Sequence, residues 1–168
     1  MEKPVQSGDR PLTYFLFEGS TEEAFYKRII QTYLKNLYID SRDIEGGGNI
    51  GRAVLATAGP PFVKKGQHLR IYCCIDSGKP FGQVPDFDLD IIRDNCRREK
   101  LRNILSVDAI IAAKMIESWF FYDLDGIYDY LKVTHNKRKP KSKYKTPTRC
   151  AKGDLKILFR QHDERYRE

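Results

Sequence analysis

The stretch that most constrains the fold is a strand, turn and helix-start pattern near the N-terminus. An apolar and aromatic run over residues 12–17 ends at Glu18, Gly19 and a Ser-Thr pair. Acidic residues then open a segment over 21–35 whose apolar positions recur at helical spacing, which predicts an amphipathic helix. Glu18 is therefore placed at the carboxyl end of a buried strand, where open α/β sheets keep their ligand sites. The alternative is that Glu18 only caps or solvates the turn.

This first helix carries two further expectations. Ser20 or Thr21 is predicted to be its N-cap, with acidic residues in the first turn where the helix dipole favours them. Its apolar stripe is expected to pack on the sheet as part of the core, and it consists of Phe25, Ile29, Ile30, Tyr33 and Leu34.

Two more apolar runs are typical of strands that are covered on both faces. One spans 69–76 and ends at Asp76, and the other spans 104–113 and is followed by a segment containing Glu117. A short strand or strand edge is predicted over 37–39, and helices over 49–57, 87–100, 125–131 and from about 153. These elements predict one α/β domain over 1–168, with a small Rossmann-like, mostly parallel sheet of about four strands and helices on both faces.

Acidic residues at the strand ends indicate a metal site. The carboxyl ends of parallel strands lie on one edge, so Glu18 and Asp76 come together if their strands are neighbours. Two convergent carboxylates outline a Mg²⁺ site, because this ion takes one or two carboxylates and keeps several waters. Asp86 and Asp88 either form an acidic first helical turn or reach the same metal.

The net charge of +7 is concentrated in one segment. Residues 132–152 contain no acidic side chain, and the rest of the chain is close to neutral. Such a block favours binding to the phosphates of DNA or RNA, and the other interpretation is a solvated loop. Its predicted nucleic-acid-binding residues are Lys137, Arg138, Lys139, Lys141, Lys143, Lys145, Arg149 and Lys152.

The remaining composition favours a cytoplasmic protein that does not enter a membrane. No apolar run reaches the ~18 residues that a membrane span requires, and no signal segment opens the chain. The four cysteines have no CxxC spacing, so we expect reduced thiols and no zinc or disulfide.

Three short motifs resemble a known family. The Phe17-to-Glu22 turn is similar to the glutamate motif of Toprim domains, the metal-dependent modules of topoisomerases, primases and overcoming-lysogenization-defect nucleases. Together with Ile75-Asp76-Ser77 and the more specific Glu117-Ser118-Trp119 piece, it resembles a bacterial Toprim-like family named domain of unknown function 4276, often tied to phage defence. The resemblance covers about residues 12 to 160.

The resemblance implies roles for these residues. Glu18 would be the general acid or base and a metal ligand, and Asp76 the first aspartate of the Toprim acidic pair. The second aspartate would lie two positions on, where this chain has Gly78. Glu117 would be an additional catalytic acid, or an acid that acts from behind the metal ligands. The implied cofactor is Mg²⁺ or Mn²⁺, and the implied partners are nucleic acid and an ATPase protein.

These observations predict a Mg²⁺-dependent, phosphodiester-cleaving nuclease of the Toprim type within a phage-defence or mobile-element system. Either Asp86 or Asp88 replaces the missing carboxylate, or the metal site is incomplete. In the second case the chain is a catalytically silent Toprim-like subunit that docks on nucleic acid or on a partner.

Overall fold

The computed structural model describes residues 11–34, 39–44, 47–59, 63, 66–79, 88–140 and 146–162. Its strands are β1 (Leu12–Phe17), β2 (Ile39–Asp43), β3 (Leu69–Asp76) and β4 (Ile104–Ala112). Its α-helices are α1 (Ser20–Tyr33), α2 (Ile50–Thr57), α3 (Leu89–Arg98), α4 (Ile116–Phe120), α5 (Leu124–Tyr130) and α6 (Lys152–Arg160). Short 3-10 turns lie at η1 (Gly47–Asn49), η2 (Phe121–Asp123), η3 (His135–Lys137) and η5 (Pro147–Arg149).

The chain divides into two compact units where the sequence predicts one domain. Unit 1 contains residues 1–75 and 87–111, and unit 2 contains residues 76–86 and 112–168. Asp76 and Ala112, the last residues of β3 and β4, are both counted with unit 2.

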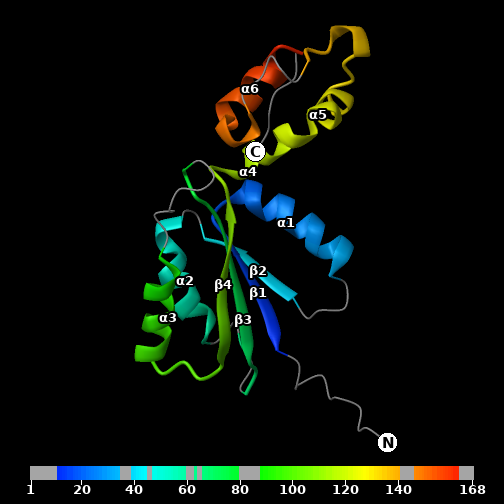
Figure 1. Cartoon of the computed structure of the whole chain (residues 1–168). Helices are drawn as coiled ribbons and strands as arrows, with labels where there is room; N and C mark the ends of the chain where they lie inside the picture. Colours follow the sequence, from blue (N-terminus) through cyan, green and yellow to red (C-terminus); the bar gives the residue numbers. More distant parts are fainter. Residues whose placement is uncertain are drawn as a thin grey trace, which may run out of the picture. The chain divides into compact units, whose positions relative to one another are not determined.

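Unit 1 is built on a four-stranded, all-parallel sheet with the order β2-β1-β3-β4. Helix α1 covers one face, and α2 and α3 cover the other (Figure 1). The predicted fold class, a small Rossmann-like α/β sheet with helices on both faces, is confirmed. All six residues of β1 are buried because both of its faces are covered. Alternate residues of β1 and β3, such as Leu16 and Ile71, enter one core cluster with Ile50 and Ile92 of the helices.

The face covered by α1 is aromatic. The rings of Phe17 and Tyr26 stack with centroids 6.0 Å apart, and Phe15 stacks on Tyr72 at 5.3 Å. The predicted apolar stripe of α1 is wrong in part, because Ile29 and Tyr33 are exposed. The helix instead buries positions four residues apart, Glu22 and Tyr26, so a carboxylate occupies a core-facing position.

Strand β2 and the start of α1 also differ from the expectation. Strand β2 has the polar sequence IDSRD and pairs with β1 from Thr13↔Ile39 to Phe17↔Asp43. It is an edge strand, where backbone pairing defines the strand and charged side chains are tolerated; of the predicted span 37–39, residues 37 and 38 lie outside the described residues. Gly19, not Ser20 or Thr21, is the N-cap of α1, and no side chain caps the helix.

Unit 2 is a small helical unit with a core of its own. The buried residues of this core come from η2, α5, α6 and the segments between them: Phe121, Leu124, Tyr128, Leu131, Val133, Cys150, Leu155 and Leu158. The predicted helix from about 153 begins one residue earlier, at Lys152.

Candidate metal centre

The strand order marks one edge of the unit 1 sheet as the place for a ligand. Strand β2 follows β1 on one side, whereas β3 and β4 lie on the other side, so the order reverses between β1 and β3. Open α/β sheets bind ligands beyond the carboxyl ends of the strands at such a switch point. Phe17 and Cys74 pair at this edge, and the Glu18 N–H donates to the Cys74 carbonyl at 3.2 Å. Glu18 is therefore at this edge, half-buried.

Glu22 is a buried carboxylate that sequence reasoning missed as a candidate. It lies in the first turn of α1, and a Cβ placed on Gly19 would approach its Oε2 to 3.2 Å. Burial, together with charge on Cys73 and Glu22, raises the pKa of the Cys74 thiol to about 12, so Glu22 is near the end of β3. The spacing of four between Glu22 and Tyr26 on α1 is the available sequence signal for this placement.

Unit 2 holds the carboxylate pair. Asp76 Oδ1 accepts a hydrogen bond of 2.8 Å from the backbone N–H of Ile116, the first residue of α4. The next residue, Glu117, is 3% exposed. One carboxylate oxygen of each acid lies within 4.8 Å of the other. The hydrogen bond to α4 thus fixes the direction of Asp76 and the approach of Glu117 together.

A backbone turn around Ser77 holds this geometry. Ser77 Oγ accepts hydrogen bonds from the N–H groups of Lys114 at 2.7 Å and Lys79 at 3.1 Å, and donates to the Lys79 carbonyl at 2.7 Å. The Ser77 N–H donates to Ala112 O and the Gly78 N–H to Lys114 O, both at 2.9 Å. The end of β3 is therefore fastened to the chain that leads into α4.

Gly78 has a structural reason to be glycine. Its φ of +66° lies in the left-handed region, where a side chain is strained. The resemblance implies an aspartate here, so the departure matches the backbone of this turn. The second carboxylate near Asp76 belongs instead to Glu117.

The side chain of Lys152 places a positive charge beside Glu117. Its Nζ lies 3.7 Å from Glu117 Oε1, and its side chain is 33% exposed. The start of α6 is docked on α4, because Ser118 Oγ donates to the Cys150 carbonyl at 2.8 Å and Lys152 N–H approaches Met115 Sδ at 3.1 Å. The formal charges of Asp76, Glu117 and Lys152 sum to −1.

Asp88 lies at the start of α3 in unit 1. It is exposed and its Oδ1 accepts from the N–H groups of Asp90 at 3.0 Å and Ile91 at 3.2 Å, so it is the N-cap. The structure thus supports the acidic first-turn alternative for Asp88. Asp86 lies outside the described residues.

The basic segment is more ordered than the predicted loop over 132–152, since η3 and η5 lie within its described parts. Lys137, Lys139 and Arg149 are exposed, whereas Lys152 pairs with Glu117. Arg138 is half-buried: it pairs with Asp129 and with Asp125 at 3.9 Å, and lies 5.8 Å over the Tyr128 ring. Lys141, Lys143 and Lys145 lie outside the described residues.

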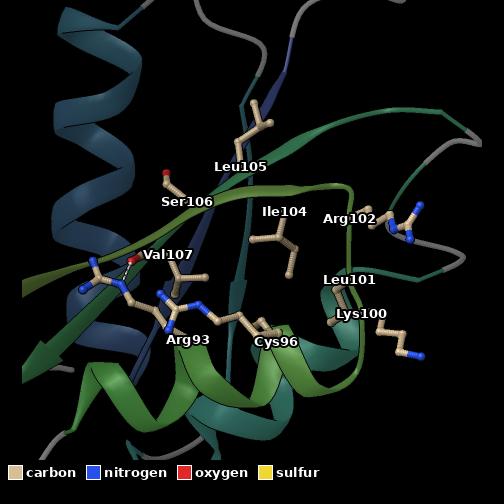
Figure 2. Close-up of a pocket in the computed structure, with 10 residues that line it drawn as sticks. Arg93, Cys96, Lys100, Leu101, Arg102, Ile104, Leu105, Ser106 and Val107 are labelled. Carbon is tan, nitrogen blue, oxygen red and sulfur yellow. Dashed lines mark hydrogen bonds between the residues drawn. The ribbon is translucent and has the colours of Figure 1, made fainter.

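Unit 1 also has an open groove, of about 540 Å³, between the second half of α3 and the start of β4. Figure 2 shows Arg93 at one end, with its Nε donating to the Val107 carbonyl at 2.9 Å. Lys100 and Arg102 lie at the other end, where α3 leads into β4. Arg93 also pairs with Asp90 and Asp108, so part of the positive charge in this groove is already neutralised.

A scan against protein families and searches of curated proteins and of solved structures find no match to this chain. Within the described part of the chain, no helix combines the length and apolar character needed to cross a bilayer.

The donor set at Asp76 and Glu117 fits a hard divalent cation. Carboxylate oxygens are the ligands preferred by Mg²⁺ and Mn²⁺, and Mg²⁺ commonly binds through one or two carboxylates while it keeps several waters. Both acids are held by backbone structure, and a nearby lysine balances part of their charge. The pair is therefore a candidate site for such a cation.

Proposed function

We propose that this chain is a Mg²⁺- or Mn²⁺-dependent, phosphodiester-cleaving nuclease of the Toprim type that acts on nucleic acid. The observation that carries the proposal is the approach of the Asp76 and Glu117 carboxylates to within 4.8 Å at the end of a parallel strand. Buried or half-buried like charges are costly to hold together, and functional sites are where proteins keep them.

Asp76 and Glu117 would hold the metal through their oxygens. A bound metal of this kind supplies positive charge to the scissile phosphate and lowers the pKa of an attacking water. Lys152 would change partner from Glu117 toward phosphate oxygens, since an ammonium group is a point-charge donor to them. Glu18 keeps the acid or base role that the resemblance implies, and Glu18→Gln tests that role.

The experiment compares two aspartates that accept a backbone N–H at a helix start. Asp76→Asn retains an oxygen for the Ile116 N–H, so unit 2 keeps its fold while the site loses one charge. Asp123→Asn is the matched control, because Asp123 Oδ1 accepts from the Gly126 N–H at 3.0 Å and is exposed. Cleavage of plasmid and transfer RNA is measured with Mg²⁺ and with Mn²⁺.

We expect Asp76→Asn to lower the cleavage rate by at least ~100-fold, the scale of losing an electrostatic contact to the transition state. Asp123→Asn should cleave at the wild-type rate. Equal rates for wild type and Asp76→Asn would refute the proposed role of Asp76. Nucleic-acid binding with neither cleavage nor metal binding by the wild type would instead favour the catalytically silent subunit.

A further inference from the structure

Unit 2 presents an exposed aromatic pair that the proposed metal centre does not use. Tyr130, the last residue of α5, is 75% exposed, which is more than any other large apolar or aromatic side chain among the described residues of this unit. Its ring contacts that of Phe159 in α6, with centroids 6.0 Å apart and planes tilted by 36°. A large exposed aromatic ring braced by a second ring is suited to receive a flat ligand.

Helix α6 connects this pair to the carboxylates. Lys152, Lys156 and Phe159 are spaced by four and three residues, so they follow one another along one side of the helix. Lys152 contacts Glu117 at one end of this row, and Phe159 contacts Tyr130 at the other. Seven residues of α-helix span about 10 Å, which is about three nucleotides at the rise of a stacked strand.

The charge around the row suits a polyanion. The acids of α5 that would repel phosphate, Asp125 and Asp129, are both paired with Arg138. Lys132, Lys156 and Arg160 are exposed on the chain beside Tyr130 and Phe159. A strand of nucleic acid would therefore have cations beside its phosphates and an aromatic ring against one of its nucleobases.

We propose that Tyr130 stacks on a base of single-stranded nucleic acid whose backbone follows α6 from Phe159 to Lys152. The inference rests on the proposed function, for which it names the substrate class. A base offers its face only when it is unpaired, so a single strand is favoured over a duplex. The scissile phosphate at Asp76 and Glu117 would lie about three nucleotides from the stacked base.

The test measures binding of the full chain to fluorescein-labelled 20-mers, single-stranded and duplex, by anisotropy in EDTA. Tyr130→Ala should bind the single strand about 5- to 150-fold more weakly, the cost of one lost base stack. Tyr130→Phe keeps the ring and should bind within about twofold of wild type. Tyr33→Ala is the matched control, because Tyr33 is 77% exposed and lies in α1 of unit 1. A second variant, Lys156→Gln, should make the negative slope of log affinity against log salt shallower by about 0.7 on the single strand.

Three results would overturn the inference. Tyr130→Ala and Tyr33→Ala binding alike would exclude stacking on Tyr130. Equal losses on single strand and duplex would show that the ring does not select an unpaired base. Absence of nucleic-acid binding by the wild type would indicate a protein partner for this face. Binding is measured in EDTA, so it does not depend on the metal. If binding depends on Tyr130 but the chain cleaves nothing with Mg²⁺ or Mn²⁺, the proposed nuclease activity is refuted and this inference stands.

Discussion

Replacing Glu117 by glutamine separates a metal-binding carboxylate from one that stabilises the fold. Glu117 is buried, within 4.8 Å of an Asp76 carboxylate oxygen and 3.7 Å from Lys152 Nζ. At an effective dielectric constant near 20, the repulsion is worth about 3 kcal/mol and the attraction about 4 kcal/mol. Lys152 is a third exposed, so solvent screens its attraction further and the two terms nearly cancel.

What remains is the cost of burying a charge. Removing a carboxylate from water costs several kcal/mol, and the neutral amide of glutamine avoids most of that cost. We therefore expect the metal-free Glu117→Gln protein to be more stable than wild type by about 2 kcal/mol. For a chain of this size this stabilisation raises Tm by about 4 to 8 °C.

Adding the metal should make the wild type the more stable of the two proteins. Mg²⁺ or Mn²⁺ at ~100 times its Kd stabilises the wild type by about 3 kcal/mol, because only the folded chain presents the site. Glu117→Gln should gain little of this. The assay is thermal unfolding with and without metal, followed by circular dichroism and by the fluorescence of Trp119, two residues after Glu117.

Glu23→Gln is the matched control. Glu23 also pairs with a lysine, Lys27, at 2.6 Å, but its side chain is 29% exposed. Losing this surface pair should cost only about 0.5 kcal/mol and should leave the metal response intact. If the free energy of unfolding of metal-free Glu117→Gln instead falls by about 3 kcal/mol or more, the ion pair with Lys152 stabilises the fold. The argument that the buried Glu117 charge destabilises the metal-free protein would then be wrong.

Two further predictions concern positions outside the acid pair. Lys100 and Lys132 follow the C-caps of α3 and α5 with a φ of 54° each, so Lys100→Gly and Lys132→Gly should each raise the free energy of unfolding in urea by about 1 kcal/mol. Arg98→Gly, at the last residue of α3, should lower it by up to about 1 kcal/mol, and destabilisation by all three variants would contradict the prediction. Burial raises the pKa of Cys73 and of Cys74 from 9.0 to about 12, so between these values the folded chain holds protons that the unfolded chain has lost, and stability should fall by ~1.4 kcal/mol per pH unit for each thiol. Urea unfolding from pH 8 to 11 should give a shallower decline for Cys74→Ala than for wild type, and parallel curves would show that the thiol is not protected.

Local pattern was enough to predict β1, β3 and β4 of unit 1, but it placed β2 over 37–39 where the described strand is Ile39–Asp43. The spans of β1 and β3 match their apolar runs: all six residues of β1 are buried, and β3 is apolar except at Arg70 and Asp76. The α1 stripe was misjudged because helical spacing gives several possible faces, and the sheet selects the one with Glu22 and Tyr26. An apolar count favours Ile29 and Tyr33, whereas the path of the chain out of β1 leaves them in solvent.

The candidate site was predictable only one residue at a time. Asp76 follows from the rule that ligands bind at strand ends, and Glu117 was singled out by the resemblance around Ser118 and Trp119. Their approach depends on Ser77 and Lys114 fastening two segments that are far apart in the sequence. Backbone hydrogen bonds of this kind leave no pattern in side-chain types, so the pairing appears only in the folded chain.

The glycine two positions after Asp76 shows why spacing along the chain misleads at this site. A pair of aspartates separated by one residue presents both carboxylates from one strand end, and Gly78 at this position suggests an incomplete site. In the folded chain Gly78 takes a left-handed turn, and its N–H donates to Lys114 O, which brings the start of α4 alongside the end of β3. An aspartate at 78 would strain that turn, and the turn is what delivers Glu117. The residue that removes one carboxylate from the sequence motif therefore helps to position another in space.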